Sequence, residues 1–227
     1  MGDSTQWIIT WLSAPRWQRY LRAASNDPDK ALALYEWNLQ LAAALMHDVA
    51  HIEVAVRNSY NKVLEDHWAG GEHWLLDSSS PIRSALVRKR RGKNIDLNER
   101  NRRSIDEAFQ RLHTNAPAVG AIIAELSFGF WRHLTDTAHE KTLWVPYLSR
   151  AFPKGTNRRD IEASLMMINT VRNRASHHEP LFTSRREEEI TQCQAKIVDL
   201  AQMLLPELAT HLQATSTITT VLGQKPI

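Results

Sequence analysis

Apolar side chains recur at intervals of three and four residues through one long segment, between Asp27–Pro28 and Gly70–Gly71. That spacing places them on one face of an α-helix, whereas a strand would require alternation with a period of two. Asp27 followed by Pro28 is a favourable helix start, because the Asp side chain can cap free backbone amides and Pro is favoured at the first helical position. The segment therefore predicts one long helix, or two helices end to end. Its apolar positions are Leu34, Leu41, Leu45, Val49, Ile52, Val56, Tyr60 and Val63.

Most of the remaining chain shows the same helical spacing. With only eight glycines and no sustained two-residue alternation, the sequence predicts an all-α fold without a sheet. Ser184 and Glu187 form a capping box that starts one helix, and the aromatic stretch 127–131 is expected to belong to the core. The last dozen residues, rich in Thr and Ser, are expected to be frayed. Further helices are predicted over residues 99–113, 117–126, 158–176 and 184–204.

The chain contains no internal repeat and no recognisable linker. One helical domain is therefore predicted over residues 1–227, with an ordered core at about 10–212 and a basic insertion or loop at 78–103. A chain of this length can bury a sizeable core as one domain.

The basic segment gives the chain an uneven charge. The formal net charge is only +3, yet nine Lys or Arg residues lie between Arg83 and Arg103 against Asp96 and Glu99. A strong local positive field suits a polyanionic partner such as RNA, although a solvated loop that only aids solubility would have the same composition. The candidate RNA-binding residues of this segment are Arg88, Lys89, Arg90, Arg91 and Lys93.

Cysteine and histidine usage narrows the possible sites. The single cysteine, Cys193, excludes an intrachain disulfide framework and a multi-cysteine zinc site, and it fits a reducing cytoplasm. No apolar run approaches the roughly 18 to 20 residues of a membrane span, so a cytoplasmic protein without a membrane partner is expected. His47 and His51 are four residues apart on a helix, but no third metal ligand is evident. We therefore expect neither a metal nor a cofactor.

The decapeptide V-R-N-R-A-S-H-H-E-P at residues 171–180 concentrates the polar chemistry of the chain. Asn173 and His177 are four residues apart and so share a helix face, and Arg172 can turn to the same side as the helix loosens before Pro180. Such a cluster of a guanidinium, an amide and an imidazole could hold a phosphodiester.

RNA cleavage without a metal requires three groups, and the decapeptide can supply them. A base removes the proton of the ribose 2′-hydroxyl, a cation stabilises the charge on phosphorus, and an acid protonates the leaving oxygen. His177 is the candidate acid or base, since imidazole titrates near neutral pH. Arg172 would stabilise the phosphorane, and Asn173 would orient the phosphate or the imidazole. A helix C-terminus that carries cations only to favour the helix dipole is the structural alternative.

The same residues resemble a known signature. Arg172, Asn173 and His177 match the R-N-x-x-x-H form found in HEPN ribonucleases, and the run R-N-R-A-S-H-H-E-P-L resembles the C-terminal block of the Abi-like (abortive infection) proteins, which are bacterial phage-resistance factors. Four further blocks agree in order, so the resemblance covers about residues 10–212. These blocks are Tyr35, Trp37 and Asn38; His51, Glu53, Val54, Arg57 and Asn58; residues 125–131; and Leu143, Trp144, Pro146 and residues 151–153.

The resemblance implies a HEPN-like helical bundle, metal-independent endoribonuclease activity and a toxin-like antiphage role. It also implies a homodimer with facing signature helices, and two chains would supply the two imidazoles that act as base and acid. An inhibitory protein or an RNA antitoxin would restrain such an enzyme. The alternatives are a non-catalytic RNA-binding module and a protein-interaction helical module.

Four further residues are candidates for lining the site. His178 would contact the substrate or hydrogen-bond to a neighbouring carbonyl. Glu53 and Arg57 lie one helical turn apart, beside Asn58. They would line the same cleft as the signature or form a buried ion pair that fixes helix packing, and we favour the ion pair.

Overall fold

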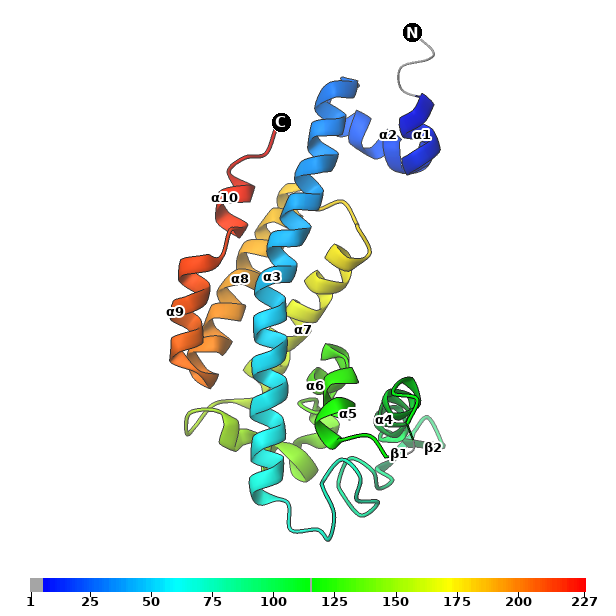
Figure 1. Ribbon diagram of the computed structural model, residues 1–227, viewed down its shortest axis with the longest axis vertical. Helices are drawn as coiled ribbons and strands as arrows, with labels where there is room; N and C mark the ends of the chain where they lie inside the picture. Colours follow the sequence, from blue (N-terminus) through cyan, green and yellow to red (C-terminus); the bar gives the residue numbers. More distant parts are fainter. Residues whose placement is uncertain (1–5, 115) are drawn as a thin grey trace.

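A single helix, α3 (Pro28–His67), forms the axis of the molecule (Figure 1). The computed structural model describes residues 6–114 and 116–227, and its predominance of helix confirms the all-α class. The side chain of Asp27 accepts hydrogen bonds from the amides of Asp29 at 3.0 Å and Lys30 at 3.1 Å, so α3 begins where the sequence predicts. Of the two arrangements that the periodicity allowed, one continuous helix is the one observed.

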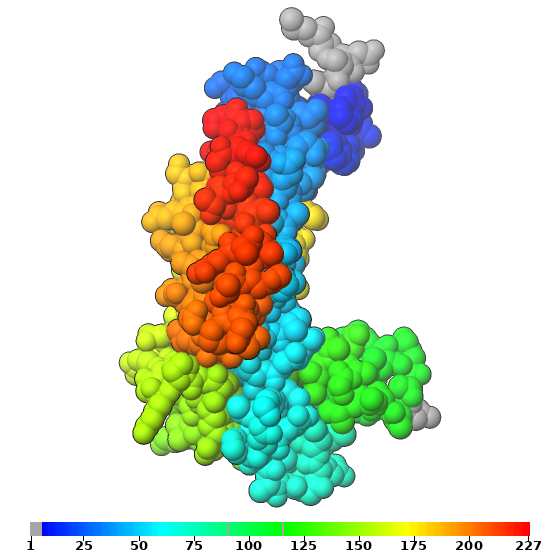
Figure 2. All heavy atoms as spheres, turned by 60° about the vertical axis from the view of Figure 1, so that its left-hand side comes forward, coloured from blue at the N-terminus to red at the C-terminus, as the bar shows by residue number. Residues whose placement is uncertain are grey.

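The C-terminal half of the chain builds a bundle on α3 (Figures 1 and 2). Buried Asn38 contacts Leu181, just after α7, whereas Tyr60 contacts Thr135, whose carbonyl binds Arg158 at the start of α7. α7 therefore runs antiparallel to α3. α7, α8 and α10 pack against α3, and α9 packs against α8. The four helices are α7 (Arg158–Ser176), α8 (Ser184–Leu204), α9 (Pro206–Thr215) and α10 (Ile218–Leu222).

The two ends of α3 carry different structures. At its N-terminal end lie α1 (Gln6–Leu12) and α2 (Ala14–Ala23). At its other end a lobe projects sideways from the bundle (Figure 2). Phe128, Phe130 and Trp131 of this end are each at most 3% exposed, which confirms the prediction that they belong to the core. The elements here are β1 (Val87–Arg90), β2 (Lys93–Asp96), α4 (Glu99–Arg111), α5 (Val119–Glu125), α6 (Phe128–His133), and the short helices η1 (Thr137–His139), η2 (Glu140–Trp144) and η3 (Leu148–Ala151).

The basic segment contains a hairpin, so the prediction of no sheet is wrong at this point. β1 pairs antiparallel with β2, and Arg91 and Gly92 form the turn with φ angles of 50° and 79°. Two successive positive φ angles suit the right-handed twist of a two-residue hairpin. The strands are short, and the first three residues of β2 are exposed. Because neither strand has an alternating apolar face, hydrophobic periodicity could not detect the hairpin.

The C-terminal residues are packed rather than frayed, contrary to expectation. Ile218 is fully buried, and Trp37 donates its indole N–H to the carbonyl oxygen of Val221 at 2.6 Å. The Ser216 hydroxyl donates to the buried carboxylate of Asp48 at 2.6 Å. These partners all come from α3, far away in the sequence, so composition near the C-terminus could not reveal them.

The cap of α8 lies one residue earlier than predicted. Thr183, not Ser184, is the N-cap, and its hydroxyl accepts a hydrogen bond from the Arg186 amide at 3.4 Å. With Thr183 as the cap, the third helical position holds Arg186, which cannot complete a capping box. Glu187 instead pairs with Lys225 at 2.7 Å.

By length and composition alone, α3 could cross a membrane, contrary to the expectation that no segment would. α3 is apolar enough for this because Glu36 is the only charged residue between Ala31 and Met46. Its buried face includes Asn38 and Asp48 and packs against α2, α7, α8 and α10. That environment is the one expected for the central helix of a folded bundle.

Truncation of Ile218 tests whether α10 belongs to the cooperative core. Ile218→Ala removes a fully buried side chain and should lower the free energy of unfolding by about 3 kcal/mol. Thr220→Ala, at an exposed position of the same helix, is the matched control and should change it by less than about 0.5 kcal/mol. Urea unfolding followed by circular dichroism measures both. Equal effects of the two substitutions would contradict a packed α10.

Candidate functional site

The signature residues lie at the C-terminal end of α7. Arg172 donates from Nη1 to Asn173 Oδ1 at 3.3 Å, and its Nε is buried without a hydrogen-bond partner. In the part of the chain that the structure describes, no carboxylate pairs with the Arg172 guanidinium. His177 is exposed, and its amide still donates to the Asn173 carbonyl at 3.0 Å. Helical spacing thus extends to His177 and keeps Asn173 and His177 on one face.

The helix ends at the second histidine of the pair. His178 has a φ angle of 54°, its amide donates to the Ala175 carbonyl at 3.0 Å, and the Glu179 amide donates to the Arg174 carbonyl at 2.9 Å. This pair of bonds is the Schellman motif, in which the left-handed position is usually glycine. The structure therefore assigns the His178 backbone to helix termination, while its side chain is exposed.

Buried Asn38 on α3 holds the segment that follows. Its amide nitrogen donates to the Glu179 carbonyl at 3.2 Å, and its Oδ1 accepts from the Leu181 amide at 2.6 Å. The two bonds fix the backbone on both sides of Pro180. The end of the signature is therefore anchored to the central helix, although its side chains remain accessible.

The two arginines of the decapeptide have different roles. Arg174 pairs with Glu189 of α8 and lies 3.9 Å from the carboxylate of Glu179. Glu189 also binds Arg186 at 2.7 Å and Arg185 at 3.2 Å. Although desolvation raises the pKa of Glu189, hydrogen bonding from Arg186 and the charges of Arg174 and Arg186 together lower it. Arg174 is thus neutralised by an ionised carboxylate, whereas Arg172 is not.

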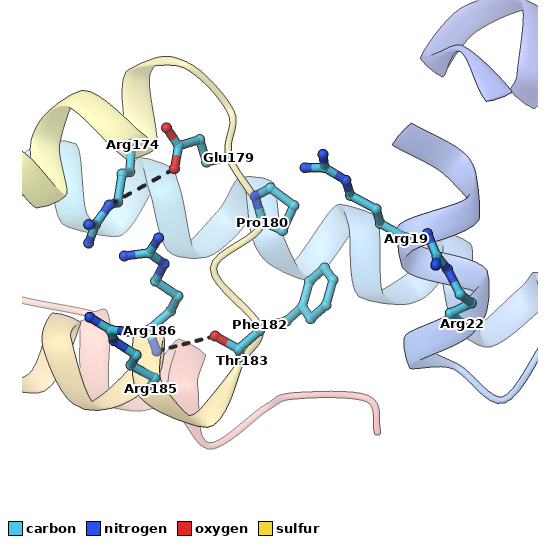
Figure 3. Close-up of a pocket in the computed structure, with 9 residues that line it drawn as sticks. All are labelled: Arg19, Arg22, Arg174, Glu179, Pro180, Phe182, Thr183, Arg185 and Arg186. Atoms are coloured by element: carbon cyan, nitrogen blue, oxygen red, sulfur yellow. Dashed lines mark hydrogen bonds and ion pairs between the residues drawn. The ribbon is translucent and has the colours of Figure 1, made fainter. Parts of the chain in front are cut away.

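An arginine-lined pocket adjoins the signature (Figure 3). It is an open concavity of about 740 Å³ between α2, the segment after α7, and the start of α8. Arg19 and Arg22 of α2 are exposed, and neither has a carboxylate partner among the residues that the structure describes. The charge of the pocket is therefore positive, and it suits an anionic ligand. Its lining residues are Arg19, Arg22, Arg174, Glu179, Pro180, Phe182, Thr183, Arg185 and Arg186.

The candidate residues of α3 lie away from the signature of their own chain. With a rise of about 1.5 Å per residue, Glu53 is about 20 Å along α3 from Asn38, beside which the signature ends. The favoured Glu53–Arg57 ion pair is wrong: both side chains are partly exposed, and no ion pair joins them in the described structure. Arg57 instead lies 3.4 Å from the amide oxygen of Asn58. Asn58 lines a separate groove against Leu205 and Leu208.

The basic segment is also remote from the signature. Arg88 and Lys89 of β1 border a hollow with Thr137, and Thr137 binds Arg158 at the start of α7. The signature lies at the opposite end of α7, about 27 Å away for a helix of 19 residues. Lys93 on β2 is exposed, as is Arg91 in the turn, and the Arg90 side chain lies outside the described part of the chain. The fold therefore does not bring this segment to the signature.

The histidine pair on α3 has a third neighbour that the sequence did not reveal. His51 lies between His47 and His211 of α9, with ring centroids 4.9 Å and 5.3 Å apart. His47 is already engaged, since its Nδ1 lies 2.9 Å from the carboxylate of Asp48. Among the described residues, the group whose ligand atoms converge as a metal site requires is a different one, His133, Asp136 and His139.

A comparison with protein families gives the chain a relationship. It matches the family model described as "Abi-like protein" over residues 8–183, more than half of its length. The chain belongs to the Abi-like protein family. Membership of this family suggests a role in abortive infection. No curated protein and no solved structure matched the chain. The matched range includes the signature and the two pocket arginines of α2, Arg19 and Arg22, and it ends before Arg185 and Arg186.

The arginine pocket of this Abi-like protein was missed in the sequence. Arg16, Arg19 and Arg22 recur every third residue, and Arg185 and Arg186 follow the signature closely. The three-residue spacing is a signal for a basic helix face. The sequence around these arginines, however, does not show that α2 lies beside the end of α7, because that proximity depends on where α2 and α7 each pack along α3.

Replacing the histidine at the left-handed position separates its backbone role from its imidazole. In this Abi-like protein, His178→Gly should raise the free energy of unfolding by about 1 kcal/mol, because glycine adopts a positive φ angle without strain. Ser176→Gly, within the last turn of α7, should lower it by about 0.5 kcal/mol. Urea unfolding of the two variants measures both changes. A lower free energy of unfolding in His178→Gly would show that the His178 side chain makes a contact whose stabilisation exceeds the strain of its positive φ angle.

Proposed function

We propose that this Abi-like protein is a metal-independent RNA endonuclease of the HEPN type that acts as an abortive-infection effector. The observation that carries the proposal is the guanidinium of Arg172, which has no carboxylate partner in the described structure and hydrogen-bonds to Asn173, the residue one turn before exposed His177. A cation that lacks a carboxylate partner is available to a phosphate, whereas Arg174, two residues further along the chain, is occupied by Glu189. The purely structural alternative, cations that favour the helix dipole, does not require this difference.

The proposed reaction is attack within the RNA chain. An imidazole takes the proton of a ribose 2′-hydroxyl, and the 2′-oxygen forms a bond to the adjacent phosphorus. Arg172 stabilises the phosphorane through its planar fork of donors. The bond to the 5′-oxygen breaks, and an imidazolium donates the proton that this oxygen takes up. The products are a 2′,3′-cyclic phosphate and a 5′-hydroxyl end, so no nucleophilic side chain is consumed.

A homodimer would supply both proton-transfer groups. Each chain offers His177, and two facing signatures would place one imidazole on each side of the phosphate. The exposure of His177 and the anchoring of the following backbone at Glu179 by Asn38 both favour such an arrangement. An exposed side chain on a fixed backbone keeps its attachment point in place when a second chain approaches.

The arginine pocket would bind the RNA backbone beside the reacting phosphate. Arg19 and Arg22 are exposed cations of α2, and Arg185 and Arg186 extend the positive charge along α8 (Figure 3). Phosphate contacts by arginine position RNA without reading its sequence. The basic hairpin lies on the other lobe, away from the signature, and no phosphate contact is assigned to it.

An enzyme with this activity would have to be restrained in an uninfected cell. An inhibitory protein or RNA that covers His177 or the arginine pocket would restrain it. The second candidate function is a non-catalytic RNA-binding module, which uses the same pocket but not the imidazole.

Substitution of His177 tests catalysis directly. His177→Ala should abolish toxicity in a bacterial culture and should remove new 5′-hydroxyl ends from total RNA, with a loss of about 100-fold or more in cleavage of purified RNA. Arg172→Ala should give a similar loss because the phosphorane charge is no longer stabilised. The matched control is His178→Gly, which removes the neighbouring imidazole at a position where glycine preserves the helix end.

Three outcomes distinguish the functions. Loss of cleavage in His177→Ala with activity kept in His178→Gly supports the proposed nuclease. RNA binding that needs Arg172 but not His177, without cleavage by the wild type, would identify the non-catalytic module. If neither substitution changes RNA binding, cleavage or growth, the signature does not act on RNA. Sedimentation of the wild type measures the proposed dimer.

The salt dependence of RNA binding tests the arginine pocket. The double variant Arg19→Gln, Arg22→Gln should weaken RNA binding and reduce the slope of log K against log salt concentration by about 2, since each lost phosphate contact removes about one unit. The matched control, Lys89→Gln with Arg91→Gln on the hairpin, removes the same charge and should leave the slope nearly unchanged. A reduced slope in the hairpin variant, with an unchanged slope in the α2 variant, would place the RNA on the hairpin.

A further inference from the structure

A compact polar cluster lies where α6 meets η1 and α4, at the opposite end of α7 from the signature. His133, Asp136 and His139 each offer one ligand atom here, and these atoms all lie within 4.8 Å of one another. His139 is fully buried, and the side chains of His133 and Asp136 are 16% and 24% exposed. The question is which ring nitrogens carry protons, because only an unprotonated nitrogen can bind a metal.

The hydrogen bonds of Asn98 determine the protonation of His139. The amide nitrogen of Asn98 donates to the carbonyls of Pro81 at 2.6 Å and Ser84 at 2.8 Å. Its Oδ1 must therefore face His139, whose Nε2 lies 2.8 Å away. Because Oδ1 can only accept, Nε2 of His139 carries a hydrogen. In the neutral imidazole the lone pair is then on Nδ1, which lies 2.6 Å from Asp136 Oδ1.

Asn101 has the same effect on His133. Its amide nitrogen donates to Asn98 Oδ1 at 3.0 Å, so its own Oδ1 is the atom 2.9 Å from His133 Nδ1. Nδ1 of His133 therefore carries a hydrogen, and the neutral ring has its lone pair on Nε2. That atom lies 3.3 Å from Asp136 Oδ2. Two amides on α4 and at its start thus direct both imidazole lone pairs toward one carboxylate.

This arrangement is the one that a metal ion requires. Histidine ligands of metals donate their other ring N–H to an oxygen acceptor, which sets the tautomer and orients the ring. Two ligands that are each about 2.0 Å from a tetrahedral zinc ion stand about 3.3 Å apart, the separation of His133 Nε2 and Asp136 Oδ2. His139 Nδ1 faces the other carboxylate oxygen, Oδ1, at 2.6 Å, so the Asp136 carboxylate would turn to bring one oxygen to ligand distance from an ion held by both imidazoles.

We propose that His133, Asp136 and His139 form a zinc-binding site with two nitrogen ligands and one carboxylate. Water completes the tetrahedron on the partly exposed side of His133 and Asp136, which is also the path of entry. The site differs from the expectation that the chain binds no metal. The three ligands are spaced three residues apart around the end of α6 and the start of η1, a spacing that the His47–His51 pair does not share.

The role of the ion is structural and independent of the proposed RNA cleavage. Asn98 and Asn101 connect the site to α4, and Asn98 also binds the chain before the basic hairpin. A bound ion would therefore attach the projecting lobe of Figure 2 to the bundle. The site and His177 are separated by the length of α7, so the ion does not act on the reacting phosphate.

Zinc titration of the full-length, metal-depleted protein tests the site. Competition with a chromophoric chelator should give one zinc ion per chain, and the melting temperature should rise with zinc concentration. His133→Ala and Asp136→Asn should each weaken zinc binding by more than tenfold. The control His51→Ala removes a histidine of the α3 cluster and should leave the affinity unchanged. Cobalt bound to the wild type should show the visible absorption of a tetrahedral ion, a readout that needs no substitution.

Three results would overturn the proposal. If the wild type binds neither zinc nor cobalt, a proton alone joins His139 to Asp136. Equal zinc affinity in the wild type, His133→Ala and Asp136→Asn would exclude these ligands. Loss of binding only in His51→Ala would place the ion on the α3 histidines. The test is separable from that of the nuclease, since His177→Ala should bind zinc normally and the metal-depleted protein should still produce 5′-hydroxyl ends.

Discussion

Burial of one face of α3 along its whole length organises the molecule. A helix of 40 residues is about 60 Å long and cannot shield its apolar side chains by itself. α2, α7, α8 and α10 each cover part of this face, so their positions relative to one another follow from where they meet α3. Asn38 fixes the end of α7 near one end of the helix, and the Tyr60–Thr135 bond fixes its start near the other. The signature and the cluster of His133, Asp136 and His139 are therefore separated by the length of α7.

The distribution of carboxylates determines which cations are available. Glu189 neutralises Arg174 and also binds Arg185 and Arg186, which is more positive charge than one carboxylate balances. No comparable partner reaches Arg172 in the described structure. An uncompensated, partly buried guanidinium costs stability, and such a cost is expected where a residue serves a ligand rather than the fold. The same argument distinguishes exposed Arg19 and Arg22, which face the pocket without a carboxylate partner in the described chain.

The polar cluster near α6 shows the opposite organisation. There, the side-chain amides of Asn98 and Asn101 each form hydrogen bonds through both the nitrogen and the oxygen, and so they set the tautomers of His139 and His133. These hydrogen bonds leave the side chains little freedom to move. At the signature, the backbone is fixed by Asn38 and by the left-handed turn at His178, while His177 remains accessible. The fixed side chains of the cluster suit the retention of an ion. The accessible side chain at the signature suits an encounter with a large substrate or a second chain.

Local patterns were sufficient to predict α3, α4, α5, α7 and α8, the start of α3 at Asp27 and the aromatic core around Trp131, because capping and periodic burial are properties of neighbouring residues. The signature at 172–177 was likewise visible in the sequence. The hairpin was not predicted because its short strands have no buried face. The packing of α10 was not predicted because its partners Trp37 and Asp48 lie far away in the sequence. The remoteness of Glu53 and the approach of α2 to the end of α7 depend on packing along α3, and the contacts of Asn98 and Asn101 with His139 and His133 depend on how α4 packs against this end of the molecule. Contacts between residues far apart in the chain are decided by how the helices bury their apolar faces together, which no single segment specifies.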